Sequence, residues 1–423
     1  MWEKLIRIFK TEDLRNKILY VLGLLVIFRL VAAIPIPGID KERLITFLQG
    51  NQFFGLLDMF SGGAMSNLSI VMLGVGPYIT SSIIMQLLTM IFPSLKALYF
   101  EEGEIGKRKF NRISRFLTVP LGLLQGYGIL MLLKNKGVLG SIDTLHFFAN
   151  ILTITAGTVF LMWIGELISE VGIGNGVSII IFGGIIAGLP SNVQQTLVGY
   201  SAENIPMYLG FIISSIFVIA GVVILNEGIR NVSVSYAKRV RGSKVYGGVS
   251  SNLPLRVNQA GVIPIIFAIS IILFPQMIAN FLPLTKISWL ISVSNAVNSF
   301  FQDQFWYAVV YFILVFLFTY FYTAVTFDPK SISDNLQKQG AFVPGIRPGQ
   351  PTADHLAKIM NRITLAGGFA LGLVAVLPYI IQGLTGQQTL TIGGTAILIV
   401  VSVALDIMKQ IRAQMTMREY EGF

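Results

Sequence analysis

The chain has 423 residues and a net charge of +10; 54% of its residues are hydrophobic and 12% are charged. Because soluble domains carry about 25% charged residues, this composition indicates a polytopic membrane protein. The chain has no cysteine, which excludes disulfide bonds, thiolate metal sites and cysteine nucleophiles.

The first segment, residues 1–17, is too charged for the apolar core of a cleavable signal, and we expect a retained cytoplasmic amphipathic segment. Ten apolar runs follow, each a candidate membrane span: 18–37, 64–92, 113–133, 147–165, 177–189, 207–225, 257–280, 305–327, 363–384 and 389–408. The fifth run is short enough for a re-entrant segment. The number of spans therefore depends on the charges of the loops.

The loop charges favour ten spans with both ends of the chain in the cytoplasm. Most Lys and Arg residues then lie in cytoplasmic segments, including the basic segments 226–256 and 328–362. Omitting the fifth span would move both segments to the other side of the membrane, against the positive-inside rule. The ten spans divide into two halves of opposite topology, residues 18–200 and 201–408, and residues 409–423 form a cytoplasmic tail.

The second and seventh spans hold equivalent positions in the two halves, and glycine and proline interrupt both. The interruptions are Gly74-Val75-Gly76-Pro77 and Gly261-Val262-Ile263-Pro264. A matched pair of broken helices in inverted halves indicates a central pathway through the membrane. Two tolerated kinks are the alternative.

The sequence of the second span predicts two half-helices. The first, residues 64–73, is too short to cross a bilayer at about 1.5 Å per residue. The second, residues 78–92, puts Ile79 and Ile83 one turn apart on one face. Because non-helical backbone at membrane depth needs protein or water around it, we expect this span to line a cavity.

Motifs of catalysis, nucleotide binding and metal binding are missing. The sequence has no glycine-lysine phosphate loop, no HExxH motif and no metal-spaced pair made by its two histidines. The glycine-rich segment 172–176 lacks the spacing of a phosphate loop and predicts a tight turn between helices. We expect no enzymatic activity, no cofactor and no metal.

Acidic residues are also missing from the interior of the spans. Glu166, Glu170, Glu227 and Asp406 lie at span ends, and Arg29 alone lies well inside a span. Proton- and ion-coupled transporters usually have carboxylates at membrane depth, so the pattern favours a pore whose wall does not bind what passes. A secondary transporter of a small solute is the alternative, because it shares the inverted halves and the broken helices.

Several longer motifs resemble those of one known family, and they run along the length of the chain. They are Ile34-Pro35-Ile36-Pro37-Gly38, Phe60-Ser61-Gly62-Gly63-Ala64, Gly165-Glu166 followed by Gly172-Ile173-Gly174-Asn175-Gly176, Tyr236-Ala237-Lys238-Arg239, Leu253-Pro254-Leu255-Arg256-Val257-Asn258, and Ala341-Phe342-Val343-Pro344-Gly345-Ile346-Arg347-Pro348-Gly349. On these motifs the chain is similar to the SecY family, the central subunit of the bacterial protein-conducting channel. The resemblance implies an all-α polytopic fold of ten transmembrane helices in two inverted five-helix halves around a central pore. It also implies that the channel passes unfolded secretory polypeptides and releases hydrophobic segments sideways into lipid.

The resemblance implies roles for three groups of residues around the pore. The pore ring of bulky aliphatic side chains would consist of Ile79, Ile83, Ile181, Ile266 and Ile399. The plug, which closes the ring from the extracytoplasmic side, would consist of Phe60, Ser61, Gly62, Gly63, Ala64, Met65, Ser66, Asn67, Leu68, Ser69 and Ile70. A lateral gate would lie between spans two and three and spans seven and eight, with the candidates Thr89, Gln125 and Asn258. Ordinary helix packing is the alternative for any single isoleucine, and independent local hydrogen bonds are the alternative for the gate.

The resemblance also implies partners at the cytoplasmic loops and in the membrane. The ribosome and the SecA motor ATPase would dock on Lys238, Arg239, Arg241, Lys244 and Arg347. Basic side chains suit phosphate-rich ribosomal RNA, and charge that only sets the topology is the alternative. The other implied partners are the small membrane subunits SecE and SecG, unfolded preproteins with their signal sequences, and lipid, in the bacterial cytoplasmic membrane.

Overall fold

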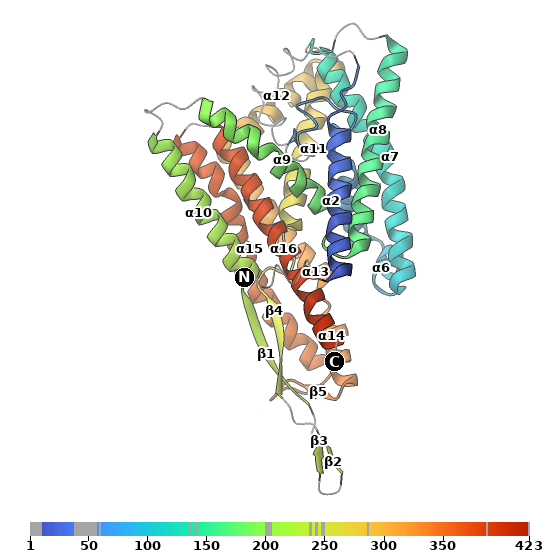
Figure 1. Cartoon of the computed structure of the whole chain (residues 1–423), viewed down its shortest axis with the longest axis vertical. Coiled ribbons are helices and arrows are strands. Elements are labelled where there is room, and N and C mark those ends of the chain that lie inside the picture. Colours follow the sequence, from blue (N-terminus) through green and yellow to red (C-terminus); the bar gives the residue numbers. More distant parts are fainter. Residues whose placement is uncertain are drawn as a thin grey trace.

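The computed structural model describes residues 11–37, 57–58, 61–135, 137–139, 143–198, 205–236, 239–241, 244–246, 250–285, 287–385 and 388–421. Long helices lie side by side through most of the molecule, and a narrow extension of strands projects from one end (Figure 1). The expected all-α fold is thus mostly helical, with a small addition of strands.

The helices of the N-terminal half are α2 (Glu12–Ala32), α5 (Gly76–Ile91), α6 (Pro93–Phe100), α7 (Gly103–Asn135), α8 (Thr144–Val171) and α9 (Gly176–Val198). Helix α8 illustrates how local sequence sets the ends. The Asp143 carboxylate accepts a hydrogen bond from the Thr144 N–H at its start, and Gly172 ends the helix in a left-handed conformation with φ of 79°. Helix α5 packs against α7, α7 against α8, and α8 against α9.

The helices of the C-terminal half are α10 (Ile205–Glu227), α11 (Ile263–Phe281), the 3₁₀ turn η2 (Leu282–Thr285), α12 (Ser288–Gln302), α13 (Gln304–Thr326), α14 (Pro329–Lys338), α15 (Gln350–Thr385) and α16 (Gln388–Glu421). Helix α13 packs against α11 and α15, and α10 packs against α15 and α16. This half is therefore a second bundle beside the first.

The two halves meet along a shared apolar core. In Figure 1, α2, α7 and α8 lie on one side, α10, α15 and α16 lie on the other, and α9 and α11 lie between them. Helix α9 contacts α16, and α11 contacts α5 and α7. The largest cluster of buried hydrophobic residues draws on both halves, so the centre of the core lies at their junction.

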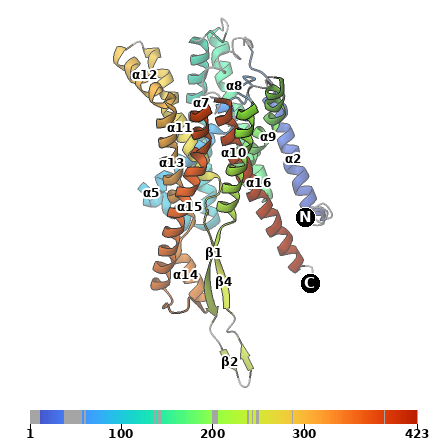
Figure 2. The same ribbon diagram turned by 90° about the vertical axis from the view of Figure 1, so that its left-hand side faces the viewer.

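The strands form a small extension beyond the helices. Strand β1 (Ile229–Tyr236) pairs antiparallel with β4 (Ser250–Arg256) and with β5 (Ala341–Phe342), in the order β4-β1-β5. Strands β2 (Arg239–Arg241) and β3 (Lys244–Tyr246) form a hairpin at the tip, as Figures 1 and 2 show. The basic segment 226–256, expected to be a loop, is therefore largely a twisted pair of strands. Its apolar alternate residues, such as Val232, pack with Leu356 of α15 in a cluster of their own.

A helix overlaps each of the ten apolar runs, but their lengths differ. Among the described residues, four stretches are long and apolar enough to cross a membrane: Gly103–Asn135, Thr144–Val171, Gln304–Lys338 and Gln350–Gly383. Helices α5 and α6, bent by 112° at their junction, count as a fifth if they are one span, and shorter apolar helices occur at Gly176–Pro190, Ile212–Glu227 and Ile263–Ala279. The chain is a multi-pass membrane protein, and the count of ten spans stays a prediction.

Two expectations about secondary structure are wrong. Residues 64–73 form consecutive turns instead of a half-helix, because Gly62, Gly63 and Gly74 all have positive φ and interrupt helical backbone. The segment before α11 is likewise non-helical up to Gly261, which has φ of 62°. In addition, helix α12 lies between the seventh and eighth apolar runs, where no helix was predicted, because its many Ser and Asn residues hide the apolar periodicity.

Candidate functional site

Five isoleucines from four helices belong to the central apolar core. Ile79 and Ile83 lie on α5, Ile181 on α9, Ile266 on α11 and Ile399 on α16; all five are buried and belong to one cluster. Both halves of the chain contribute. The side chains are branched and apolar, so they offer no hydrogen bond to a passing peptide. The five share one buried cluster, and their arrangement and function as a ring stay a prediction.

Residues 61–75, here called the turn segment, are packed tightly against the core. Ala64, Met65, Leu68 and Ser69 are almost completely buried, and Ala64 belongs to the same cluster as the five isoleucines. Most of the residues predicted as a plug lie in this segment. Phe60 lies outside the described residues.

The turn segment pairs with the chain that follows α2. The Ile36 N–H donates to the Leu68 carbonyl at 2.9 Å, and the Ile70 N–H donates to the Ile34 carbonyl at 3.0 Å. Pro35 and Ser69 form an isolated antiparallel bridge between these bonds. Three consecutive residues of the turn segment are thus held as in a short two-stranded sheet.

Glycine contacts bring the turn segment unusually close to the helices. A Cβ atom placed on Gly184 of α9 would lie 2.3 Å from the Gly62 Cα, and one on Gly157 of α8 would lie 2.2 Å from the Ile70 carbonyl oxygen. Real side-chain contacts lie near 3.5–4.0 Å, so only glycine fits at either position. Gly62 also has φ of 69°, which glycine adopts without strain.

Arg29 of α2 also contacts the turn segment. It lies in the last turn of α2, and its guanidinium donates a hydrogen bond to the Gly62 carbonyl. The Asp58 carboxylate accepts hydrogen bonds from the N–H and the hydroxyl of Ser66, at 2.7 and 2.5 Å. Arg29 was not among the predicted site residues. Its position as the one charge well inside a span was the signal that could have identified it.

Replacing Arg29 by methionine should loosen the turn segment. A hydrogen bond from a charged donor contributes about 1.5–3 kcal/mol, and methionine keeps much of the length of the side chain without any donor. We expect the Arg29→Met variant to show frequent ion-conducting openings in planar bilayers, where the unchanged protein is nearly silent. Arg15→Met is the matched control, because Arg15 also lies on α2 but pairs with Glu12 at 3.6 Å in an exposed position. Equal conductance of the two variants would contradict a role for Arg29 in closure.

A cavity of about 840 Å³ is lined in part by two of the five isoleucines. Helices α5, α7, α8, α9 and α11 line it, with Ile79 and Ile266 at its apolar part and several charged residues elsewhere. The charged lining includes Glu104, Lys107, Arg108, Arg112, Arg115, Glu166 and Glu170. Arg115 of α7 donates a hydrogen bond to the Glu166 carboxylate of α8, which joins two walls of the cavity. The cavity thus has both charged and apolar side chains in its lining.

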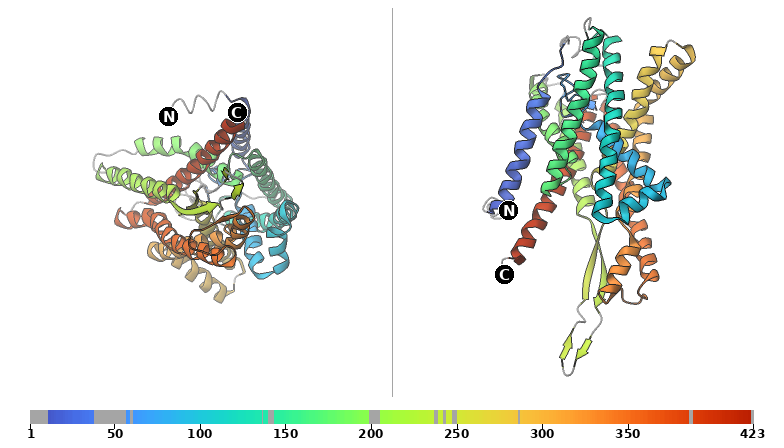
Figure 3. Two further views of the ribbon diagram at one scale, coloured as in Figure 1. Left: turned by 90° about the horizontal axis from the view of Figure 1, so that it is seen from below. Right: turned by 90° about the vertical axis from the view of Figure 1, so that its right-hand side faces the viewer.

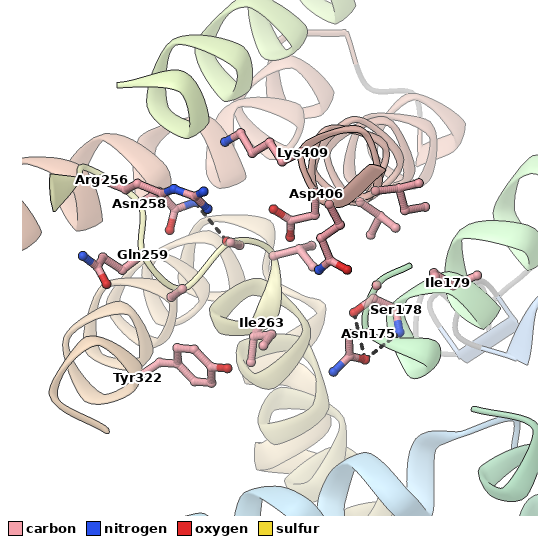
Figure 4. Close-up of a pocket in the computed structure, with 17 residues that line it drawn as sticks. Asn175, Ser178, Ile179, Arg256, Asn258, Gln259, Ile263, Tyr322, Asp406 and Lys409 are labelled. Atoms are coloured by element: carbon pink, nitrogen blue, oxygen red, sulfur yellow. Dashed lines mark hydrogen bonds between the residues drawn. The ribbon is translucent and has the colours of Figure 1, made fainter. Parts of the chain in front are cut away.

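A second, smaller cavity of about 260 Å³ lies where the segment before α11 meets α9 and α16. The Asn258 side-chain amide donates to the Asn226 side-chain oxygen at 2.8 Å and to the Gly261 carbonyl at 3.0 Å. Figure 4 shows Asn258 beside the turn that leads to Ile263, with Asp406 and Lys409 of α16 nearby. A Cβ atom on Gly261 would lie 2.8 Å from the Asp406 carboxylate. The start of α11 is therefore fixed to both α10 and α16.

Lys409 completes this polar junction just beyond the expected tenth span. Its ammonium donates a hydrogen bond to the Asn226 carbonyl and lies 3.8 Å from the Glu227 carboxylate. Burial lowers the pKa of Lys409, and the Glu227 carboxylate opposes that shift. The ion pair thus ties the end of α10 to the middle of α16.

The three gate candidates do not bond to one another. The Thr89 hydroxyl donates to the Gln86 carbonyl of its own helix at 2.6 Å, Gln125 is buried on α7, and Asn258 has the partners given above. Within the part of the chain that the structure describes, no hydrogen bond joins these side chains. Their role at a lateral gate stays a prediction.

The basic docking candidates gather at the end of the molecule that carries the strands. The backbones of Arg239, Arg241 and Lys244 form the β2–β3 hairpin (Figure 1), and Lys238 lies outside the described residues. Arg347 is exposed between β5 and α15, and its carbonyl accepts a hydrogen bond from the Thr352 hydroxyl at 2.8 Å. Over the described ranges, no group of three or more His, Asp or Glu residues could hold a metal ion.

Comparisons of the sequence with known proteins agree with one another. A family model described as SecY matches residues 69–408. The protein translocase subunit SecY of Thermotoga maritima is 40% identical over 434 residues, which cover 100% of this chain and 98% of that protein. The protein of the same name from Streptomyces galbus is 41% identical over 438 residues, covering 99% and 98% of the two chains.

The fold of this chain is similar to the folds of solved structures. A structure of a protein conducting channel matches with a TM-score of 0.64 and 20% identity, over 93% of this chain and 91% of that chain. Sec61 in the canine ribosome-channel complex from the endoplasmic reticulum matches with a TM-score of 0.60 and 18% identity, over 93% and 91%. At these identities the similarity is one of architecture.

Proposed function

The chain belongs to the SecY family, and from this membership we propose that it is the channel-forming subunit of a bacterial protein translocase. It passes unfolded secretory polypeptides across the cytoplasmic membrane. The observation that carries the proposal is that five isoleucines from both halves belong to one buried cluster, and that two of them, Ile79 and Ile266, line the large cavity. The chain is a passive conduit, and its partners supply the energy.

The transmembrane arrangement consists of ten helices in two inverted halves, residues 18–200 and 201–408, with both termini in the cytoplasm. Two observations support it. The basic residues lie mostly in the segments assigned to the cytoplasm. The N-terminal end of α2 and the C-terminal end of α16 also point toward the end that carries the strands (Figures 1 and 2).

The isoleucine ring and the turn segment close the pore in different ways. Branched aliphatic side chains fit around an extended peptide and exclude hydrated ions, because a narrow apolar constriction favours neither water nor ions. Residues 60–70, most of which belong to the turn segment, act as the plug and fill the pore when no peptide is present. The burial of Ala64 in the isoleucine cluster supports this contact.

Hydrophobic segments leave the pore through a lateral gate where α5 and α7 face α11 and α13. The support is that α11 contacts α5 and α7 across the junction of the halves. Hydrogen bonds between membrane helices contribute about 0.6 kcal/mol on average, so polar residues such as Thr89, Gln125 and Asn258 permit thermal opening. A passing segment then partitions by its own hydrophobicity: each Leu-like residue gains about 0.3–0.6 kcal/mol, and a central charge costs about 2.5–3.5 kcal/mol.

The partners are the SecE and SecG membrane subunits, the SecA motor ATPase and the ribosome. The β2–β3 hairpin and the segment around Arg347 are the docking surface on the cytoplasmic side. The position of both at the end of the molecule that carries the strands supports this, and Arg347 is exposed. The canine Sec61 structure, which is similar in fold, is a ribosome-channel complex.

Translocation into proteoliposomes tests the proposal. The purified chain with SecE and SecG is reconstituted, and SecA, ATP and a preprotein with a central test segment of varied leucine content are added outside. We expect leucine-poor substrates in the lumen, protected from protease, and leucine-rich ones in the bilayer, resistant to carbonate extraction. Vesicles that hold SecE and SecG alone are the control. No protected substrate in the presence of the chain would refute the channel, and flux of a small solute would then favour the transporter. Luminal substrate with no dependence on leucine content would refute only the lateral gate.

A further inference from the structure

Helix α12 lies apart from the main bundle, at the end of the molecule opposite the strands. It follows α11 through η2 and leads directly into α13. Figure 2 and the right-hand view of Figure 3 show it leaning away from the neighbouring helices. None of its residues is charged, which is unusual for a helix facing water on its outer sides.

One stripe of α12 is used to attach it to the protein. Ser294 is completely buried and its hydroxyl donates to the Ala279 carbonyl at 2.6 Å. That carbonyl lies in the last turn of α11, where helix carbonyls have no partner within the helix. On the same stripe, the Phe301 ring lies edge-on to Tyr307 of α13, with centroids 6.4 Å apart. Helix α12 is therefore fixed to both α11 and α13.

A second stripe is apolar and exposed. Trp289, Val293 and Phe300 are 64%, 41% and 39% exposed, and the small Ala296 between them is exposed as well. These positions are separated by four, three and four residues, so they lie on one face of the helix. Polar residues such as Ser292 and Asn295 occupy the neighbouring exposed face. The helix is thus amphipathic toward the outside, in addition to its packed stripe.

The exposed stripe continues onto a membrane-crossing helix. The Phe300 ring stacks on Trp306 of α13, with centroids 5.7 Å apart and an angle of 26° between the planes. Trp306 and its neighbour Phe305 are themselves exposed, and they begin an apolar span of which only 33% is buried inside the protein. Tryptophan is enriched where membrane helices leave the hydrocarbon core. The aromatic surface of α12 therefore adjoins the lipid-facing side of α13.

We propose that α12 is a membrane-surface helix, whose stripe of Trp289, Val293 and Phe300 lies in the boundary between phospholipid headgroups and acyl chains. Many helices of this kind use Lys and Arg to attract anionic lipid. Because α12 has no charge, its attachment depends on apolar and aromatic contact and does not require anionic lipid. Through the Ser294–Ala279 bond it anchors the end of α11 to the bilayer surface.

Tryptophan quenching tests this placement, because the chain has only four tryptophans. Replacing Trp2, Trp163 and Trp306 by phenylalanine leaves Trp289 as the single probe and keeps an aromatic ring beside Phe300. The full chain is reconstituted in phosphatidylcholine vesicles. We expect strong quenching of Trp289 by lipids brominated near the headgroup end of the acyl chain, weaker quenching by lipids brominated near the methyl end, and weak quenching by aqueous iodide. Adding anionic lipid should leave the quenching unchanged.

Two further variants move the tryptophan probe to other positions on α12 and serve as controls for the quenching of Trp289. Asn295→Trp with Trp289→Phe, in the same background, moves the probe to the polar face of α12, and iodide should quench it more strongly than the brominated lipids do. Val293→Trp with Trp289→Phe puts a second probe on the apolar stripe, which should behave like Trp289. Equal iodide quenching at positions 289, 293 and 295 would mean that water surrounds α12, and protection from every quencher would mean that protein covers it. Either result overturns the proposal, and neither depends on translocation.

Discussion

Adding one methyl group at Gly184 should open the channel to ions. A Cβ atom there would lie 2.3 Å from the Gly62 Cα, and because the neighbour is backbone it cannot rotate away. Overpacking a tight interior costs about 1–3 kcal/mol. Such a cost shifts an equilibrium between two states by about 5- to 150-fold. The turn segment is the part that can leave, so we expect Gly184→Ala to increase the frequency of open events in planar bilayers by this order.

The same helix provides matched controls for this experiment. A Cβ atom on Gly188, one turn further along α9, would meet no atom within 4 Å, and one on Gly183 would meet the flexible end of the Leu25 side chain at 2.9 Å. Gly188→Ala should remain closed, and Gly183→Ala should open little. If Gly184→Ala is as silent as Gly188→Ala, the turn segment does not seal the pore at this contact. If both conduct equally, changed flexibility of α9 is the cause instead.

Reversing the charge of Arg347 should strongly impair motor-driven secretion while the protein remains inserted. Arg347 is exposed in the segment between β5 and α15, close to the strand extension. Arginine is enriched among the residues that dominate protein interfaces, where truncation costs at least about 2 kcal/mol. This corresponds to binding of the motor that is weaker by about 30-fold. We expect Arg347→Glu to reduce ATP-dependent import of a preprotein into proteoliposomes by a similar factor.

A second charge reversal, at Lys338, controls for the change in net charge. Lys338 is exposed at the end of α14, on the same side of the molecule, and Lys338→Glu changes the net charge by the same amount. Import by Lys338→Glu should stay near that of the unchanged protein. Normal import by Arg347→Glu, at a normal level of inserted protein, would remove the docking role assigned to Arg347. Equal losses in both variants would assign the effect to the general positive potential of this surface.

Part of the candidate site could be predicted, because some of its sequence features are local. The broken second span was visible as glycine and proline in an apolar run, and the isoleucines one turn apart on α5 followed from helical periodicity. The resemblance to a known family supplied the three more distant isoleucines. The prediction of a half-helix over residues 64–73 was wrong because apolar composition does not determine φ. Three glycines in or beside this segment have positive φ. Helix α12 was missed because its polar residues interrupt the apolar run, although its exposed and packed stripes both follow the helical period.

The sequence by itself determined the class of the protein, the positions of its apolar runs, the segments in which its basic residues gather and the family to which it belongs. These properties depend on composition and on short motifs, which are local. Only the tertiary structure decided that Arg29 bonds to Gly62, that Gly62 lies against Gly184, and that Ser294 ties α12 to α11. Such contacts join segments far apart in the chain. Their formation depends on how whole helices pack, and no local pattern encodes that.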